Sequence, residues 1–122
     1  MKTFLTFLIC FYMSSIANSQ FVNYRHLLIF GKETQPAMVK KQMELLDSVK
    51  AGVAERDIKI TLVPTGSELH RKYKTKPGAF TIILVGKDGG EKHRTTTFLK
   101  PQELFSIIDA MPMRRSEMRK ND

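Results

Sequence analysis

The sequence predicts an α/β domain in which helices pack on a four-stranded mixed sheet. Short apolar runs of strand length alternate with longer stretches whose apolar residues recur at helical spacing. The last two strand-like runs are separated only by a glycine-rich turn, which is typical of an antiparallel hairpin. The 122 residues include a single cysteine, so packing and not disulfide bonds must hold the domain together.

Residues 1–19 have the features of a secretory signal peptide. Lys2 supplies a positive charge, the run from Phe4 to Met13 is apolar, and Ala17-Asn18-Ser19 is a small-x-small cleavage site. An uncleaved N-terminal anchor is the alternative, but the polar residues after the apolar run argue against it. Cleavage would remove Cys10, the only cysteine, and we expect export to the periplasm or the extracellular space.

The remaining residues, 20–122, have the length of one domain and end in a basic tail at 113–122. Loss of Lys2 would reduce the formal net charge from +8 to about +7, which is high for a chain of this size. This charge either serves solubility alone or attracts an anionic partner. No other segment is apolar enough to cross a membrane, so we do not expect the mature chain to span one.

The first half of the domain is predicted as strand, helix, strand. Residues 26–30 form a short apolar run closed by Gly31, as expected of a buried strand. Pro36 suits the first turn of a helix, and the apolar stripe that follows predicts one amphipathic helix that Gly52 ends. Residues 58–63 alternate like a strand with one covered face.

The second half is predicted as helix, strand, strand, helix. Ser67 could cap a short helix that reaches Tyr73. Residues 80–94 contain one long apolar strand, a glycine turn and a charged return strand. Pro101 suits the start of a last helix that Pro112 should end, and we expect the tail beyond it to be frayed or weakly helical.

The predicted order of elements is therefore β-α-β-α-β-β-α. The first two strands, joined through a helix, should be parallel by a right-handed crossover, whereas the final hairpin is antiparallel. A mixed sheet of four strands with helices packed on it would cover every apolar face. This is the thioredoxin-like arrangement.

The residues that serve redox chemistry in this fold are missing. Thioredoxin-like enzymes carry a nucleophilic cysteine at the start of the first helix, but the loop at 31–36 has no thiol, and Phe80 occupies the register of their cis-proline. The histidines, His26, His70 and His93, are widely separated and show no metal-ligand spacing. We therefore predict a non-enzymatic domain without a cofactor or metal.

Three basic clusters remain as candidates for function. They lie at 70–76, at 92–94 and in the tail, and they could merge into one surface if the tail folds back beside the hairpin. Such a surface would bind an anionic polysaccharide, an envelope component or a protein partner, whereas export argues against nucleic acid. The candidate binding residues are Arg114, Arg115 and Arg119, followed by Arg71, Lys72, Lys74 and Lys76.

Two alternatives remain open. A peroxiredoxin-like enzyme or enzyme accessory could bind an anionic substrate at the helix N-terminus near 32–36, which would need a pocket between that loop and residues 78–80. The arginine-rich tail could instead be structural, docking on the body through glutamate and aspartate partners and binding nothing.

Four segments of the sequence carry a family resemblance. They are RHLLIF at 25–30, ERD at 55–57, residues 80–92 with their GKDGGEK, and IDAMPMRR at 108–115 followed by EMR at 117–119. In these segments the chain resembles the domain of unknown function numbered 4174. The resemblance implies an exported thioredoxin-like or peroxiredoxin-like fold without the catalytic cysteine, and it implies no activity.

Overall fold

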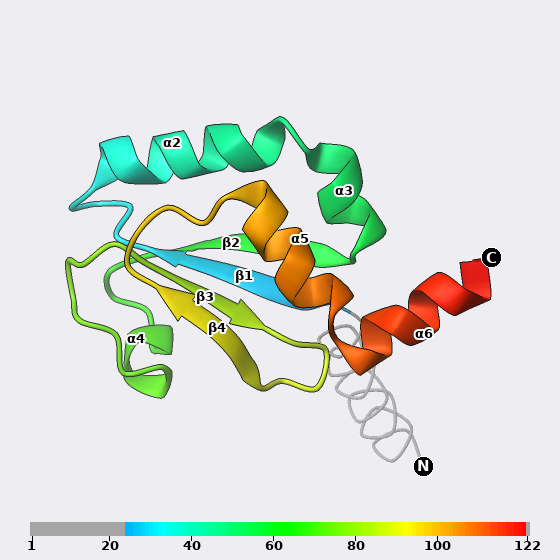
Figure 1. The fold of residues 1–122 in the computed structure, drawn as a ribbon. Helices are drawn as coiled ribbons and strands as arrows, with labels where there is room; N and C mark the ends of the chain where they lie inside the picture. Colours follow the sequence, from blue (N-terminus) through cyan, green and yellow to red (C-terminus); the bar gives the residue numbers. More distant parts are fainter. Residues whose placement is uncertain (1–23, 122) are drawn as a thin grey trace, which may run out of the picture.

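The computed structural model describes residues 24–121, and its centre is a four-stranded sheet in the order β2-β1-β3-β4 (Figure 1). The strands are β1 (Arg25–Phe30), β2 (Ile58–Val63), β3 (Thr81–Val85) and β4 (Glu91–Thr95). β1 and β2 are parallel, and the pairs β1–β3 and β3–β4 are antiparallel. The predicted α/β class, mixed sheet and element order are confirmed. The predicted signal peptide and Cys10 lie outside the described residues.

The helices cover the sheet unequally. α2 (Pro36–Asp47), α3 (Lys50–Glu55) and α5 (Pro101–Asp109) lie over one face, and the short α4 (Leu69–Lys72) lies on the other side (Figure 1). α6 (Pro112–Asn121) extends from one end of the sheet. Within residues 24–121, none of the helices is long and apolar enough to cross a bilayer.

Strand alternation divides the core into two apolar layers. Leu27 and Ile29 of β1 face α2 and α5, whereas Leu28 and Phe30 face α4. All five residues of β3 are buried because this strand is paired on both edges and covered on both faces. The long apolar run that predicted a strand therefore reflects burial on two sides.

The helix predicted after Pro36 is two helices. It breaks at Ser48, whose hydroxyl donates to the carbonyl of Leu45 at 2.7 Å, a local bond that competes with helix propagation. Gly52 does not end the helix but lies inside α3, where a Cβ would stand 2.7 Å from the Phe105 ring. This glycine is needed for close packing of α3 on α5.

The tail is helical, which resolves the choice between a frayed and a helical end. α5 ends at Asp109, and Pro112 is the first residue of α6 and not the last of α5. Proline is favoured at the first helical position because its missing N–H would have no partner there. The sequence DAMP is thus a joint between two helices.

Candidate functional site

Four exposed cations lie on and directly after α4, and we call them the α4 basic segment. Arg71 and Lys72 are in or at the end of the helix, and Lys74 and Lys76 follow it. Among the described residues, none of the four has a carboxylate within ion-pair distance. Their charges are therefore available to a ligand from solvent.

His70 fixes the shape of the α4 basic segment. Its Nδ1 lies 2.8 Å from the Thr75 hydroxyl, its Nε2 lies 3.2 Å from the Pro64 carbonyl oxygen, and its ring packs edge-on against Phe30 at 4.9 Å. The backbone N–H of Thr75 also donates to the His70 carbonyl at 3.0 Å, and Lys74 takes a positive φ of 52°. This is a Schellman-type helix end, and it holds the lysines in a defined curve.

The second predicted cluster lies next to the first but is largely compensated. Arg94 of β4 donates to the Tyr73 carbonyl at 2.5 Å and pairs with Glu91 at 2.6 Å. Lys92 pairs with Asp88 at 2.7 Å, and this hydrogen bond holds the pKa of the Asp88 carboxyl below its usual value. Arg94 therefore joins the α4 basic segment to the hairpin but adds little free charge.

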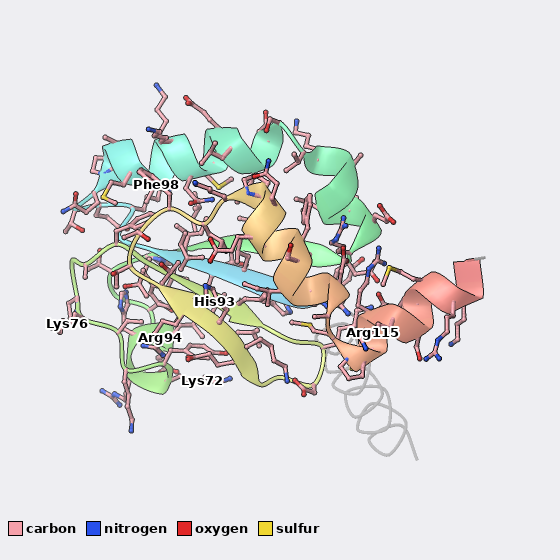
Figure 2. The ribbon with its side chains drawn as sticks, in the orientation of Figure 1. Lys72, Lys76, His93, Arg94, Phe98 and Arg115 are labelled. Atoms are coloured by element: carbon pink, nitrogen blue, oxygen red, sulfur yellow. The ribbon has the colours of Figure 1, made fainter. Side chains whose placement is uncertain are left out.

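The third predicted cluster is far from the other two. Figure 2 shows Arg115 on α6, near the end of the sheet opposite to Lys72 and Lys76, whereas Arg94 lies on the same side of the domain as those lysines. Arg115 and Arg119 are exposed on α6. The tail does not fold back beside the α4 end of the hairpin, so the three clusters do not form one surface.

The structure contradicts the prediction that Arg114 is a binding residue, because its side chain is buried and only 2% exposed. Its Nη2 donates to Glu55 at 3.0 Å, its Nε donates to Asp109 at 3.3 Å, and its Nη1 lies 3.5 Å from Glu117. All of these are intramolecular partners. Arg114 is therefore not available to an external anion, and it leaves the candidate binding set.

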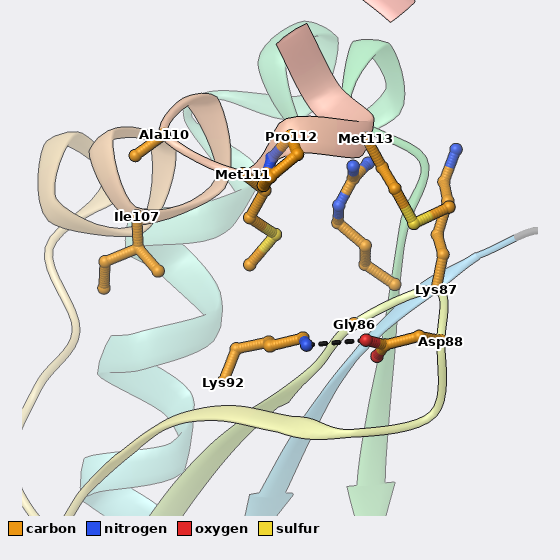
Figure 3. A pocket seen from close by; sticks show the side chains of 10 residues that line it. Gly86, Lys87, Asp88, Lys92, Ile107, Ala110, Met111, Pro112 and Met113 are labelled. Atoms are coloured by element: carbon orange, nitrogen blue, oxygen red, sulfur yellow. Dashed lines mark hydrogen bonds and ion pairs between the residues drawn. The ribbon is translucent and has the colours of Figure 1, made fainter. Parts of the chain in front are cut away.

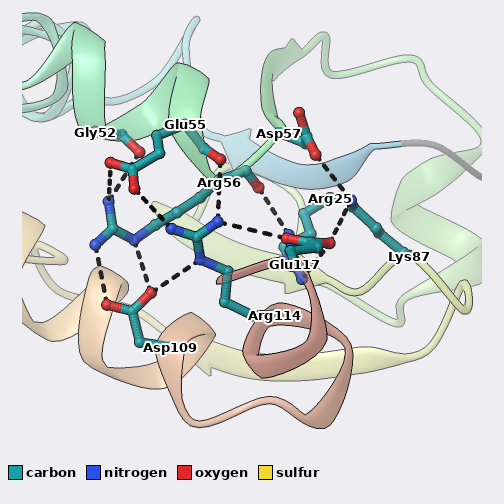
Figure 4. Close-up of polar contacts among 9 residues, drawn as sticks. All are labelled: Arg25, Gly52, Glu55, Arg56, Asp57, Lys87, Asp109, Arg114 and Glu117. Carbon is teal, nitrogen blue, oxygen red and sulfur yellow. Dashed lines mark hydrogen bonds and ion pairs between the residues drawn. The ribbon is translucent and has the colours of Figure 1, made fainter. Parts of the chain in front are cut away.

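Arg114 belongs to an ion-pair network that joins α6 to the body of the domain (Figure 4). Arg56 makes a bidentate pair with Asp109 at 3.0 and 2.9 Å and stacks over the Phe105 ring at 4.0 Å. Arg25, only 1% exposed, donates to the Arg56 carbonyl at 2.8 Å and to Glu117 at 3.3 Å. The network comprises Arg25, Arg56, Lys87 and Arg114 with Glu55, Asp57, Asp109 and Glu117.

The network shifts the ionisation of its members in the direction that favours charge. Hydrogen bonds from Arg56 lower the pKa of the Asp109 carboxyl. Burial alone would raise the pKa of Glu117, but hydrogen bonds from Lys87 and Arg25 outweigh burial and lower it. Burial likewise opposes the charged form of Lys87, yet its bonds to Asp57 and Glu117 raise its pKa. Each charged group of the network therefore stabilises the ionised form of the groups that it contacts.

The loop near the N-terminus of α2 packs against residues 78–80, in the place where the enzyme alternative needs a pocket. The Thr34 hydroxyl donates to the Gly78 carbonyl at 2.7 Å, which draws the two segments together. Phe80 is 4% exposed and packs against Phe98 at 5.9 Å between ring centroids. Its Cα lies 3.0 Å from where a Cβ on Gly31 would be. Phe80 fills the gap, and this geometry counts against a substrate site there.

Within residues 24–121, no group of three or more histidine, cysteine, aspartate or glutamate residues is placed to hold a metal ion.

Residues 20–117 match the family described as "Domain of unknown function (DUF4174)". The chain belongs to the DUF4174 family. It is 29% identical over 118 residues to the "Sushi repeat-containing protein SRPX" of Rattus norvegicus and 26% identical to that of Homo sapiens. These matches cover 81% of this chain but only 25% of each relative, so the chain spans about a quarter of their length.

One solved structure, described as "Structure of a malarial protein", is similar in fold. It superposes with a TM-score of 0.56 and 23% identity, over 71% of this chain and 96% of that one. At this identity the likeness concerns the fold alone.

The DUF4174 match spans the whole ion-pair network but ends before Arg119. Each network residue also lies in one of the segments through which the sequence resembles the family. Sequence reasoning missed Arg25, Arg56 and Lys87 as a group, because they lie in different segments of the chain. The available signal was a charged residue at the border of a strand or helix, as in RHLLIF and ERD.

Proposed function

We propose that this DUF4174 domain is an exported, non-enzymatic module with a thioredoxin-like fold that binds an anionic polysaccharide through the α4 basic segment. The observation that carries the proposal is the contrast among its cations. Arg71, Lys72, Lys74 and Lys76 are exposed, close together in the chain and without ion pairs among the described residues, whereas Arg114 on α6 and Arg94 on β4 are paired with carboxylates.

Geometry supports a polyanion in preference to a single small anion. Residues 71–76 follow a curved path held by His70, so their charges are spread along a surface and do not converge on one point. A row of exposed charges suits a partner with repeated anionic groups, because each contact is weak and the sum is large. Sulfate and carboxylate groups recur along the chain of an anionic glycan, so such a glycan is a partner of this kind.

The test is a titration of the protein with heparin at low salt, with two charge-matched variants. The first changes the α4 basic segment to glutamine: Arg71→Gln, Lys72→Gln, Lys74→Gln and Lys76→Gln. The control removes four exposed lysines that also lack an ion pair among the described residues: Lys32→Gln, Lys40→Gln, Lys59→Gln and Lys100→Gln. Both variants lose four positive charges.

We expect the first variant to bind heparin at least tenfold more weakly than the control, because binding depends on where the charges are and not only on their sum. Equal weakening in the two variants would mean that net charge alone attracts heparin. Unchanged binding in the first variant would show that heparin does not bind at the α4 basic segment. Substitutions at Arg115 and Arg119 on α6 would then be tested next.

A further inference from the structure

A second candidate site lies at the opposite end of the domain from α4. A hollow of about 510 Å³ opens between the β3–β4 turn and the joint of α5 with α6. Figure 3 shows Ile107, Met111 and Pro112 above this space and Gly86, Asp88 and Lys92 below it. Its volume falls within the roughly 300–1,000 Å³ typical of small-molecule sites.

One wall of the hollow is aliphatic. Ile107 comes from α5, Ala110 and Met111 lie in the joint, and Met113 is the second residue of α6, with 51% of its surface exposed. Methionine side chains are flexible and polarizable, and they adapt to aliphatic ligands of differing shape. An exposed apolar wall beside an open space is a feature of ligand sites.

The other wall is polar and carries cations. Lys92 reaches across the floor of the hollow, where its Cε lies 2.5 Å from where a Cβ on Gly86 would be. Its ammonium pairs with Asp88, and both side chains are partly open to solvent, so this pair can exchange for a ligand at small cost. The first turn of α6, at Pro112 and Met113, adds the positive end of a helix dipole.

Arg25 supplies the observation that points to a ligand. This residue lines the hollow, is only 1% exposed, and uses both of its terminal nitrogens on Glu117 and the Arg56 carbonyl. Its Nε–H has no hydrogen-bond partner among the described residues. A buried donor without an acceptor is unfavourable, so an acceptor on a bound molecule would complete its bonding.

We propose that this hollow binds a linear aliphatic carboxylate. The carboxylate lies at the Lys92 and Arg25 side, where it accepts hydrogen bonds, and the alkyl chain lies along Ile107, Met111 and Met113. This site is separate in space from the α4 basic segment, and its ligand is a small amphiphile and not a polymer. The two proposals therefore stand or fall independently.

The test uses decanoate and decanol as probes, added below their micelle-forming concentrations to the protein produced from its full sequence. Binding is followed by NMR of the methionine methyl groups, assigned by substitution. We expect decanoate to shift the Met111 and Met113 signals saturably while the Met118 signal, which lies outside the hollow, stays in place. Decanol should bind at least fivefold more weakly because it lacks the charge.

Two pairs of variants test the aliphatic wall and the polar wall of the hollow separately. Met113→Gln should weaken decanoate binding about fivefold, whereas Met118→Gln on the same helix should not change it. Lys92→Gln should weaken decanoate but not decanol, and Lys40→Gln, an exposed lysine on α2, should affect neither. Absence of a saturable shift, equal binding of decanol and decanoate, or equal effects of the paired variants would overturn the proposal.

Discussion

At the scale of single residues, two neighbouring arginines in the sequence MRRSEM have opposite environments. Arg114 is buried against Glu55 of α3, Asp109 of α5 and Glu117 of its own helix, whereas Arg115 is exposed on α6. A buried charge that loses its partners is costly, whereas an exposed charge without partners costs little. The pair therefore offers a matched comparison of a structural and a surface arginine.

We expect Arg114→Gln to lower the free energy of unfolding by roughly 3 kcal/mol, the scale of breaking a buried ion pair. Arg115→Gln should change it by less than about 0.5 kcal/mol, as surface substitutions usually do. Urea unfolding of the two variants beside the parent measures both values. Equal losses of stability would contradict the placement of Arg114 in the ion-pair network.

This contrast between Arg114 and Arg115 could not be predicted from the sequence. Both residues are arginines in a charged stretch without an apolar stripe, and helical periodicity does not say which face is buried when the buried face is ionic. The prediction of an arginine site therefore included Arg114. The alternative of a tail docked through glutamate and aspartate anticipated its kind of contact but not its partners.

At the scale of elements, α3 and α6 pack on the body of the domain by different means. α3 approaches α5 closely at Gly52, whose backbone faces the Phe105 ring. α6 is held to the body mainly through ion pairs of Arg114 and Glu117, because its own sequence is strongly polar. The contact of α3 with α5 depends on the absence of a side chain at Gly52, and the attachment of α6 depends on ionised side chains.

We expect Gly52→Ala to destabilise the domain by about 1–3 kcal/mol, because the new methyl group would stand 2.7 Å from Phe105 and force repacking. The gain in helix propensity, about 1 kcal/mol, offsets only part of this cost. Gly66→Ala is the control, since no heavy atom lies within 4 Å of its added Cβ. Thermal unfolding of both variants checks the prediction, which fails if Gly52→Ala is as stable as the parent.

The attachment of α6 should depend on acidity. Asp109 and Glu117 have pKa values below their ordinary 3.8 and 4.5 in the folded chain. A lowered folded pKa gives stabilisation that is present above the ordinary value and lost as pH falls through the folded value. We therefore expect this contribution to be complete at neutral pH and to decline below about pH 4.5.

Unfolding of Glu117→Gln and of the parent over a pH series measures this contribution. The parent should be more stable at pH 7, and the gap should narrow as the pH falls below the ordinary carboxyl range. Glu44→Gln, at an exposed position on α2 without an ion pair among the described residues, should show no such gap. A difference between Glu117→Gln and the parent that does not change with pH would contradict the role of Glu117 as a charged partner.

Sequence reasoning predicted the elements well where periodicity decides them and less well where a local contact decides them. The strands at 26–30 and 58–63 and the final hairpin were predicted because apolar patterns report burial directly. The break at Ser48 and the role of Gly52 depend on a single hydrogen bond and on the position of Phe105, which only the tertiary structure supplies.

At the scale of the whole molecule, the positive charge is divided between structure and surface. The α5–α6 end contains the paired cations of the ion-pair network beside the exposed Arg115 and Arg119, whereas the α4 end carries exposed cations without ion pairs at Arg71, Lys72, Lys74 and Lys76. Composition predicted an excess of positive charge but not this division. The arginine tail was predicted as the first choice and the α4 basic segment as the second. Burial removes Arg114 from the first choice, and our proposal therefore favours the α4 basic segment.

The salt dependence of heparin binding tests the central claim most directly. Released counterions make the affinity of a polyanion fall with salt, and the slope of that fall reflects how many charges make contact. The account predicts a steep slope for the parent, a similar slope for the variant with changed Lys32, Lys40, Lys59 and Lys100, and a much shallower slope for the variant with a changed α4 basic segment. Equal slopes in the two variants would contradict it.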